Sequence, residues 1–145
     1  MAITSTLCTS FKKELLQGVH NFNKASSPDT FKLALYSSTA SLDASTTAFT
    51  TSGEVTGTNY TSGGATLTLK TGTPTTDGTT AVVDFDPLTF SNVTLTAAGA
   101  LIYNSSDSNK AVCVISFGKD VSASASDFTI TFPSTGASNS IIRLA

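Results

Sequence analysis

The sequence predicts an all-β fold, an antiparallel, jelly-roll-like β-sandwich that carries one short N-terminal helix. Three observations predict it: runs of alternating apolar and polar residues recur beyond residue 30, turn-rich pieces separate these runs, and helical spacing is confined to the start of the chain. Because 145 residues fit one domain, residues 1–145 are expected to form a single sandwich.

Helical periodicity occurs only in the N-terminal segment, residues 1–23. Its apolar residues follow one another at spacings of four, one, three and three: Phe11, Leu15, Leu16, Val19 and Phe22. Thr9 or Ser10 can cap a helix that ends by about Asn21, and Gly18 weakens its last turn. Three helical turns are marginal alone, so we expect this apolar stripe to dock on the protein's own sheet or on a neighbouring molecule.

Strand signals begin after the helix and are interrupted once. Residues 31–36 alternate as a strand, and residues 37–64 then form a long loop with isolated apolar residues that should pin it to the body. Further strands are predicted at 65–70, 80–85, 88–95, 99–104, 110–118, 127–132 and 140–144, with a hairpin turn at 104–109. The expected core comprises Phe31, Leu33, Leu35, Leu67, Leu69, Val83, Phe85, Leu101, Val112, Val114, Phe128, Ile130, Phe132 and Ile142.

The composition argues against several classes of partner. Only 12% of the residues are charged and the net charge is -2, whereas 26 threonines and 21 serines make the surface neutral and rich in hydroxyls. Nucleic-acid binding requires a basic surface, and the apolar runs at 97–103 and 111–115 are too short to cross a membrane. The N-terminus lacks the basic and apolar regions of a signal peptide. We therefore expect synthesis in a cytoplasm, where Cys8 and Cys113 stay reduced and Cys113 is a buried, inert thiol.

Side chains that could perform chemistry are few. Asp84 and Asp86 would share one face of a strand about 7 Å apart, which suits a calcium site or a glycosidase pair. The preferred interpretation is a strand end that turns into solvent at Pro87. His20 is expected to have a structural or surface role. The sequence therefore predicts a protein that is not an enzyme and has no catalytic, cofactor-binding or metal-binding residues.

Glycines and tyrosines offer two further candidate binding features. Gly63 and Gly64 precede a strand and not a helix, so they do not form a phosphate-binding loop. Sugar-binding sites usually present an aromatic platform, and the chain has three tyrosines and no tryptophan. Tyr36 and Tyr103 end apolar strands and are expected at the edge of the core, which leaves Tyr60 as the candidate glycan contact.

Six segments within residues 10–144 are informative when taken together. They are Phe31-Lys-Leu-Ala-Leu-Tyr36, Tyr60-Thr-Ser-Gly-Gly-Ala-Thr-Leu67, Val83-Asp-Phe85, Phe90-Ser-Asn92, Gly99-Ala-Leu-Ile-Tyr-Asn104 and Lys110-Ala-Val112. This combination resembles a group of small virion proteins of tailed bacteriophages, some of which are cement (decoration) proteins bound outside the major capsid protein shell. The resemblance covers nearly the whole chain and brings no catalytic motif with it.

The resemblance implies a structural protein of the virion, expected to be a cement protein that binds and stabilises the outside of the capsid shell. Its expected partner is the major capsid protein of the phage shell, with a homo-oligomer as a second association and no cofactor. Two alternatives stay open: a tail or neck structural protein, and a phage adhesion or carbohydrate-binding module. We expect the loop 37–64 to make the contacts, because functional contacts concentrate on loops held by a rigid scaffold.

Overall fold

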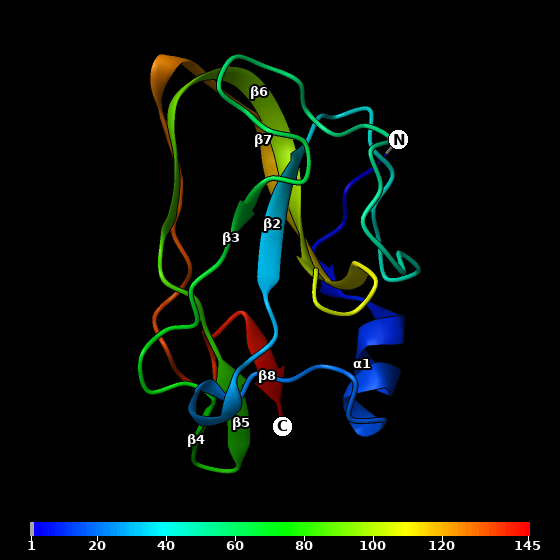
Figure 1. Cartoon of the computed structure of the whole chain (residues 1–145), viewed down its shortest axis with the longest axis vertical. Helices are drawn as coiled ribbons and strands as arrows, with labels where there is room; N and C mark the ends of the chain where they lie inside the picture. The colour runs from blue at the N-terminus through cyan, green and yellow to red at the C-terminus, as the bar shows by residue number, and fades with distance from the viewer. Residues whose placement is uncertain (1) are drawn as a thin grey trace.

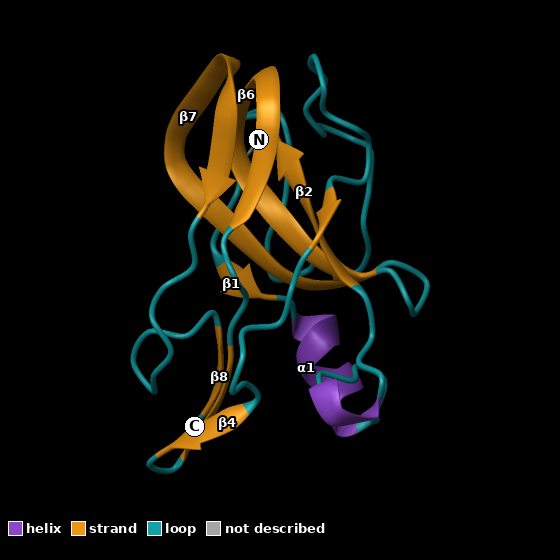
Figure 2. Ribbon diagram, turned by 60° about the vertical axis from the view of Figure 1, so that its left-hand side comes forward, coloured by secondary structure: helices purple, strands orange, loops and turns teal. Residues whose placement is uncertain are grey.

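The computed structural model describes residues 2–145, which form two antiparallel β-sheets and one α-helix around a common apolar core (Figure 1 and Figure 2). The larger sheet has the strand order β1-β7-β6-β2-β3, and the smaller has the order β4-β5-β8. The elements are β1 (Thr6–Leu7), α1 (Thr9–Leu16), a 3-10 turn (Lys24–Ser26), β2 (Phe31–Tyr36), β3 (Ala65–Thr66), β4 (Thr75–Asp77), β5 (Thr80–Val83), β6 (Leu88–Asn104), β7 (Lys110–Ile130) and β8 (Ile142–Leu144). The all-β, sandwich-like fold with one short helix is confirmed, whereas the jelly-roll connectivity is not.

The scaffold is one long, curved hairpin made by β6 and β7. The sequence predicts four shorter strands here, but the structure joins 88–95 to 99–104 and 110–118 to most of 127–132. Figure 1 shows the paired ribbon arching over one end of the molecule. The predicted turn between the two strands is confirmed, because Ser108 and Asn109 adopt positive φ angles of 51° and 56° there.

A bulge lets this hairpin curve without a break. Ala97 lies opposite Val121, yet Gly99 lies opposite Ser116, so residues 117–120 of β7 have no partner on β6. A bulge increases local twist and removes a stretch of strand from the ladder. Lys119 and Asp120 within it are exposed, and such charges discourage pairing with the open strand of another molecule.

The strand β2 fixes the long loop to this scaffold. All six of its residues pair with β6, from Phe31 opposite Asn104 to Tyr36 opposite Gly99. The loop that follows contributes Leu42 and Val55 to the core, with exposed fractions of 1% and 5%. Phe49 and Tyr60 pack against the core from the same loop, which confirms that the loop is pinned at several points.

The helix is shorter than predicted. It ends at Leu16, before the glycine expected to weaken it, because Gly18 takes a left-handed conformation with φ 72°. Cys8 occupies the N-cap position without a side-chain hydrogen bond, so the expected cap at Thr9 or Ser10 is wrong. Phe11 is fully buried against the body, as predicted for a helix that docks on its own sheet.

The apolar stripe of this segment does not dock as a whole. Phe22 stacks on Phe31 with ring centroids 4.3 Å apart and is 7% exposed. Leu16, in contrast, is 92% exposed, which corrects the expectation that the whole stripe is covered.

Among residues 2–145, no helix has the length and apolarity that crossing a bilayer requires.

The predicted core is confirmed with one exception. Thirteen of its fourteen members are buried. Phe132 is only partly covered, and its ring centroid lies 5.6 Å from that of Phe85. The strands β1 and β4 were not predicted, because a two-residue strand and an exposed run of Thr75, Thr76 and Asp77 carry no apolar alternation.

Candidate interaction surface

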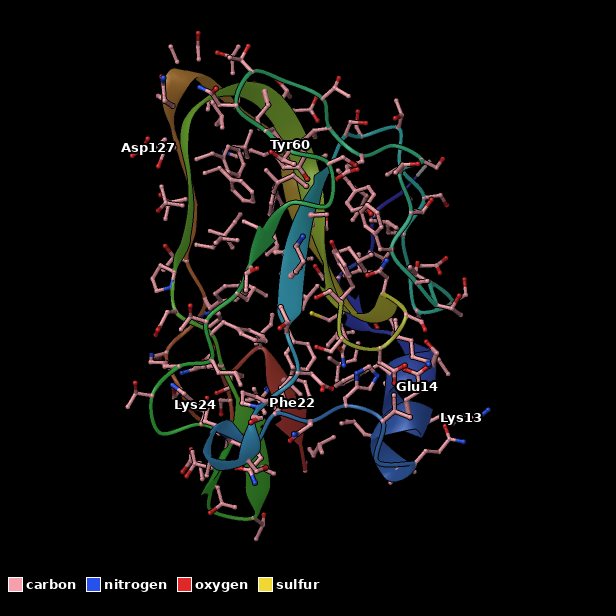
Figure 3. The ribbon with its side chains drawn as sticks, viewed as in Figure 1. Lys13, Glu14, Phe22, Lys24, Tyr60 and Asp127 are labelled. Carbon is pink, nitrogen blue, oxygen red and sulfur yellow. The ribbon has the colours of Figure 1, made fainter. Side chains whose placement is uncertain are left out.

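The loop 37–64 forms a nearly uncharged rim at the surface and is attached to the body by hydrogen bonds and buried side chains. In Figure 3, Tyr60 of this loop lies in the upper half of the molecule, and Lys13 and Phe22 lie in the lower half. Its outward residues are mostly threonine, serine and glycine, and Asp43 is the one fully exposed carboxylate among residues 37–64. Hydrogen bonds from Ser45 lower the pKa of Asp43, so this carboxylate stays ionised and tied to its own turn.

Backbone hydrogen bonds hold the middle of the loop to β2 and to the turn between β6 and β7. The amide of Val55 donates to the carbonyl of Leu35 at 3.0 Å, and the amide of Phe49 donates to the carbonyl of Asn109 at 2.9 Å. The buried hydroxyl of Tyr36 donates to the carbonyl of Thr50 at 2.6 Å. With its backbone groups engaged in this way, the loop presents a preformed surface.

Glu54 is the centre of the loop's polar contacts. Its Oε1 accepts the amide of Gly63 at 2.6 Å and the hydroxyl of Tyr60 at 2.9 Å, while its Oε2 accepts the hydroxyl of Ser62 at 2.7 Å. The Tyr60 oxygen also accepts the amide of Leu35 at 2.9 Å, so one chain of hydrogen bonds runs from the sheet into the loop. Burial, followed by the neighbouring Glu54 charge, raises the pKa of Tyr60, which keeps the hydroxyl protonated as a donor.

A hollow of about 350 Å³ opens beside this cluster. It is lined by Glu54, Tyr60, Val55 and loop hydroxyls such as Thr51 and Ser62. Sequence reasoning identified Tyr60 but missed Glu54, because a lone acid in a serine- and threonine-rich loop has no local pattern that links it to Gly63. The remaining candidate tyrosines are structural, since Tyr36 and Tyr103 are 0% and 3% exposed.

His20 belongs to a buried polar network that fastens the N-terminal segment to the hairpin turn. Its Nε2 lies 2.7 Å from Oε2 of Glu14, and its Nδ1 lies 3.0 Å from Nδ2 of Asn104. The same Nδ2 donates to Asp29 at 2.8 Å, while Oδ1 of Asn104 accepts the amide of Ser106 at 3.0 Å. Of the two roles expected for His20, structural or surface, its fully covered side chain has the structural one.

This network determines the tautomer of His20. Because Nδ2 of Asn104 is a donor, Nδ1 of the imidazole must accept, and the ring proton sits on Nε2 and donates to Glu14. Long-range ¹H–¹⁵N NMR is therefore expected to show the neutral Nε2–H form when the histidine is neutral. A spectrum of the Nδ1–H form would contradict this arrangement of the Asn104 amide.

Asp84 and Asp86 were both expected at a strand end that turns into solvent, but the structure gives them different environments. Asp84 is fully buried, whereas Asp86 is partly exposed, so the picture of a strand end turning into solvent is wrong for Asp84. Its Oδ1 accepts the amide of Phe85 at 3.2 Å, and its Oδ2 has no hydrogen-bond partner. Burial raises the pKa of Asp84, against the opposing effect of the Phe85 amide and the Lys70 charge.

The buried carboxylate makes stability depend on pH in a defined direction. A group whose pKa is higher in the folded than in the unfolded protein stabilises the fold in acid, and that stability is lost as pH rises through the folded pKa. Asp84→Asn removes this titration. We therefore expect the melting temperature of the variant, relative to that of the unmodified protein, to increase as pH is raised from about 4 to 7. A difference that stays constant over this range would show that Asp84 does not titrate differently on folding.

The other candidate side chains have structural surroundings. Cys8 and Cys113 are both buried and unpaired, and burial raises the pKa of Cys8 to about 11 and that of Cys113 further, so the expected inert thiol is supported. Gly63 donates its amide to Glu54, which occupies the group that a phosphate would need. Among residues 2–145, no group of three histidine, cysteine or acidic side chains is placed to hold a metal ion.

Comparison of the chain with family models, with curated proteins and with solved structures finds no match.

Proposed function

We propose that this chain is a structural protein of a tailed-phage virion that acts as a cement protein on the outside of the capsid shell, with no catalytic role. The carrying observation is the loop 37–64, a preformed and nearly neutral rim held on a rigid β scaffold. A neutral hydroxyl surface can be buried against another protein at lower desolvation cost than a charged one. Such a protein stabilises a shell by binding its assembled state.

The segments that carry the resemblance support this proposal through their place in the fold. Residues 31–36 form β2, and residues 99–104 form the end of β6 with which β2 pairs along its whole length. Residues 60–67 include Tyr60, Ser62 and Gly63, which donate hydrogen bonds to Glu54 and form the Glu54 cluster with it. The resemblance therefore covers both the scaffold and the base of the exposed loop.

Binding to shells that lack this protein tests the proposal. Shortening the loop is unsuitable, because it would remove Leu42 and Val55 from the core. Substituting exposed residues by arginine tests the loop without removing core residues. The double variant Thr47→Arg with Thr56→Arg places two positive charges on the rim, and the control Ser134→Arg places one positive charge outside it. The unmodified protein and the control should sediment with capsids, and the double variant should not. Failure of the unmodified protein to bind any shell preparation would refute the proposed function.

The hollow beside Glu54 favours a second candidate function, a carbohydrate-binding module. It combines one carboxylate, several hydroxyls and the ring of Tyr60, the groups that contact sugar hydroxyls and sugar C–H faces. Against this, the carboxylate already accepts three hydrogen bonds within the protein. Glycan-array binding that is saturable and is lost when Thr51→Arg fills the hollow would favour the sugar-binding function over the cement function.

A further inference from the structure

An apolar cleft lies between the N-terminal segment and the small sheet, at the end of the molecule away from the Glu54 cluster. Leu15 and Phe22 form one side, and Val82, Ile142 and Leu144 form the other. Its volume of about 160 Å³ is below the range of small-molecule sites and matches the insertion of one apolar side chain. We call it the α1–β8 cleft.

The exposed leucines of the protein belong to the elements that form this cleft. Leu16, at 92% exposed, directly follows Leu15 on α1, and Leu144, at 49% exposed, lines the cleft from β8. They are the large apolar side chains that stay exposed within residues 2–145. The rest of the surface is polar, so exposed leucines beside an apolar cleft indicate an interaction site.

Lys12 adds positive charge to the rim of the cleft, and Lys13 adds it further around the same helix. Lys12 lies three residues before Leu15 and four before Leu16, so it neighbours both on the helix surface. Lys12 and Lys13 are exposed and form no salt bridge with any residue from 2 to 145. The one acid of the helix, Glu14, is turned inward to His20, whereas Lys13 points outward in Figure 3. The outer face of α1 is therefore basic, although the net charge of the chain is -2.

This charge distribution selects among possible occupants. A second copy docked through the same face about a two-fold axis would bring Lys12 and Lys13 of both copies together, and like charges across an interface are unfavourable. A segment that carries carboxylates beside an apolar side chain would instead satisfy the lysines and the cleft at once. Such a buried apolar anchor with a charged rim is typical of protein-recognition sites.

We propose that the α1–β8 cleft docks a segment of a partner protein that inserts an aliphatic or aromatic side chain. The segment places one carboxylate against Lys12 at the rim and another against Lys13 on the outer face of α1. The docking chemistry stands apart from the proposed function. If that function holds, the shell protein supplies the segment, and the cleft and the part of the loop around Glu54 give two separate contact surfaces. Two such surfaces would let one molecule bridge neighbouring shell subunits.

A peptide titration followed by ¹H–¹⁵N NMR tests the cleft without a shell. The probe is the capped peptide Glu-Asp-Leu-Leu-Asp-Glu, and the control peptide carries lysine at its four acidic positions. The acidic peptide should shift the amides of Leu15, Val82 and Leu144 in a saturable manner. Lys12→Glu with Lys13→Glu should weaken it by roughly tenfold at low salt, and Leu16→Ala should also weaken it. Lys119→Glu, an exposed charge reversal on β7, should leave it unchanged.

The outcomes separate this inference from the proposed function. Absence of saturable shifts, equal binding of the basic peptide, or shifts confined to other elements would overturn the inference. A concentration-dependent dimer in light scattering that Leu16→Ala dissociates would also overturn it in favour of a second copy. In the sedimentation assay, shells that bind the cleft variants normally would overturn the cleft as the shell contact while supporting the proposed function. Peptide binding without shell binding supports the inference and refutes the function.

Discussion

Gly64→Ala is expected to abolish the native fold or to lower the free energy of unfolding by more than about 3 kcal/mol. Gly64 has φ +74° at the entry to β3, and a Cβ there would overlap the carbonyl oxygen of Leu33 and lie 2.8 Å from Cα of Ala34. These are backbone atoms of β2, the strand that joins the loop to the scaffold, and they cannot rotate away. Urea unfolding followed by circular dichroism measures the loss.

Gly72→Ala is the matched control for this prediction. Gly72 also has a positive φ, +84°, but nothing lies within 4 Å of its missing Cβ. Its replacement should therefore cost only the backbone strain of a left-handed alanine, about 1–2 kcal/mol. Equal losses in the two variants would mean that the contact with Leu33 contributes nothing beyond strain. That result would place the strand β2 further from residue 64 than the structure has it.

Local sequence patterns predicted the elements that carry a clear apolar or turn-forming signal. The strand β2 was predicted with its bounds, because Phe31, Leu33 and Leu35 are separated by Lys32 and Ala34 and because a loop rich in serine follows. The turn at 104–109 was predicted because turn-forming residues separate two strong apolar runs, although Asn104 is the last residue of β6. These signals are local, and local signals can be detected in a single sequence.

The features that sequence reasoning missed depend on distant partners. Residues 121–126 are strand only because β6 lies beside them, since their serines and alanines have little strand propensity. Asp84 is buried by packing around β5, and Pro87 two positions beyond its neighbour Phe85 suggested solvent instead. Leu16 has the spacing of a core residue, yet the helix ends there and leaves it in water. Periodicity identifies the apolar face of an element but not what covers that face.

Glu54→Ala should lower the free energy of unfolding by roughly 2–6 kcal/mol, because it removes the acceptor of two covered donors at about 1–3 kcal/mol each. The donors are the amide of Gly63 and the hydroxyl of Tyr60. Tyr60 in turn accepts the amide of Leu35, so the loss extends into β2. Hydrogen exchange should show faster exchange of the Leu35 and Gly63 amides in this variant than in the unmodified protein.

Glu54→Gln separates the hydrogen bonds of Glu54 from its charge. The glutamine oxygen can still accept from Gly63 and Tyr60, and the hydroxyl of Ser62 can turn to accept from the amide group. We expect this variant to lose less than about 1 kcal/mol, since only the charge assistance of these bonds is removed. If both variants unfold like the unmodified protein, Glu54 does not hold the loop. A third outcome is that both variants retain the fold and only the alanine variant loses shell binding. Binding by the glutamine variant would then show that the shell does not contact the carboxylate charge. In that case the hydrogen bonds of Glu54 shape the loop for its partner.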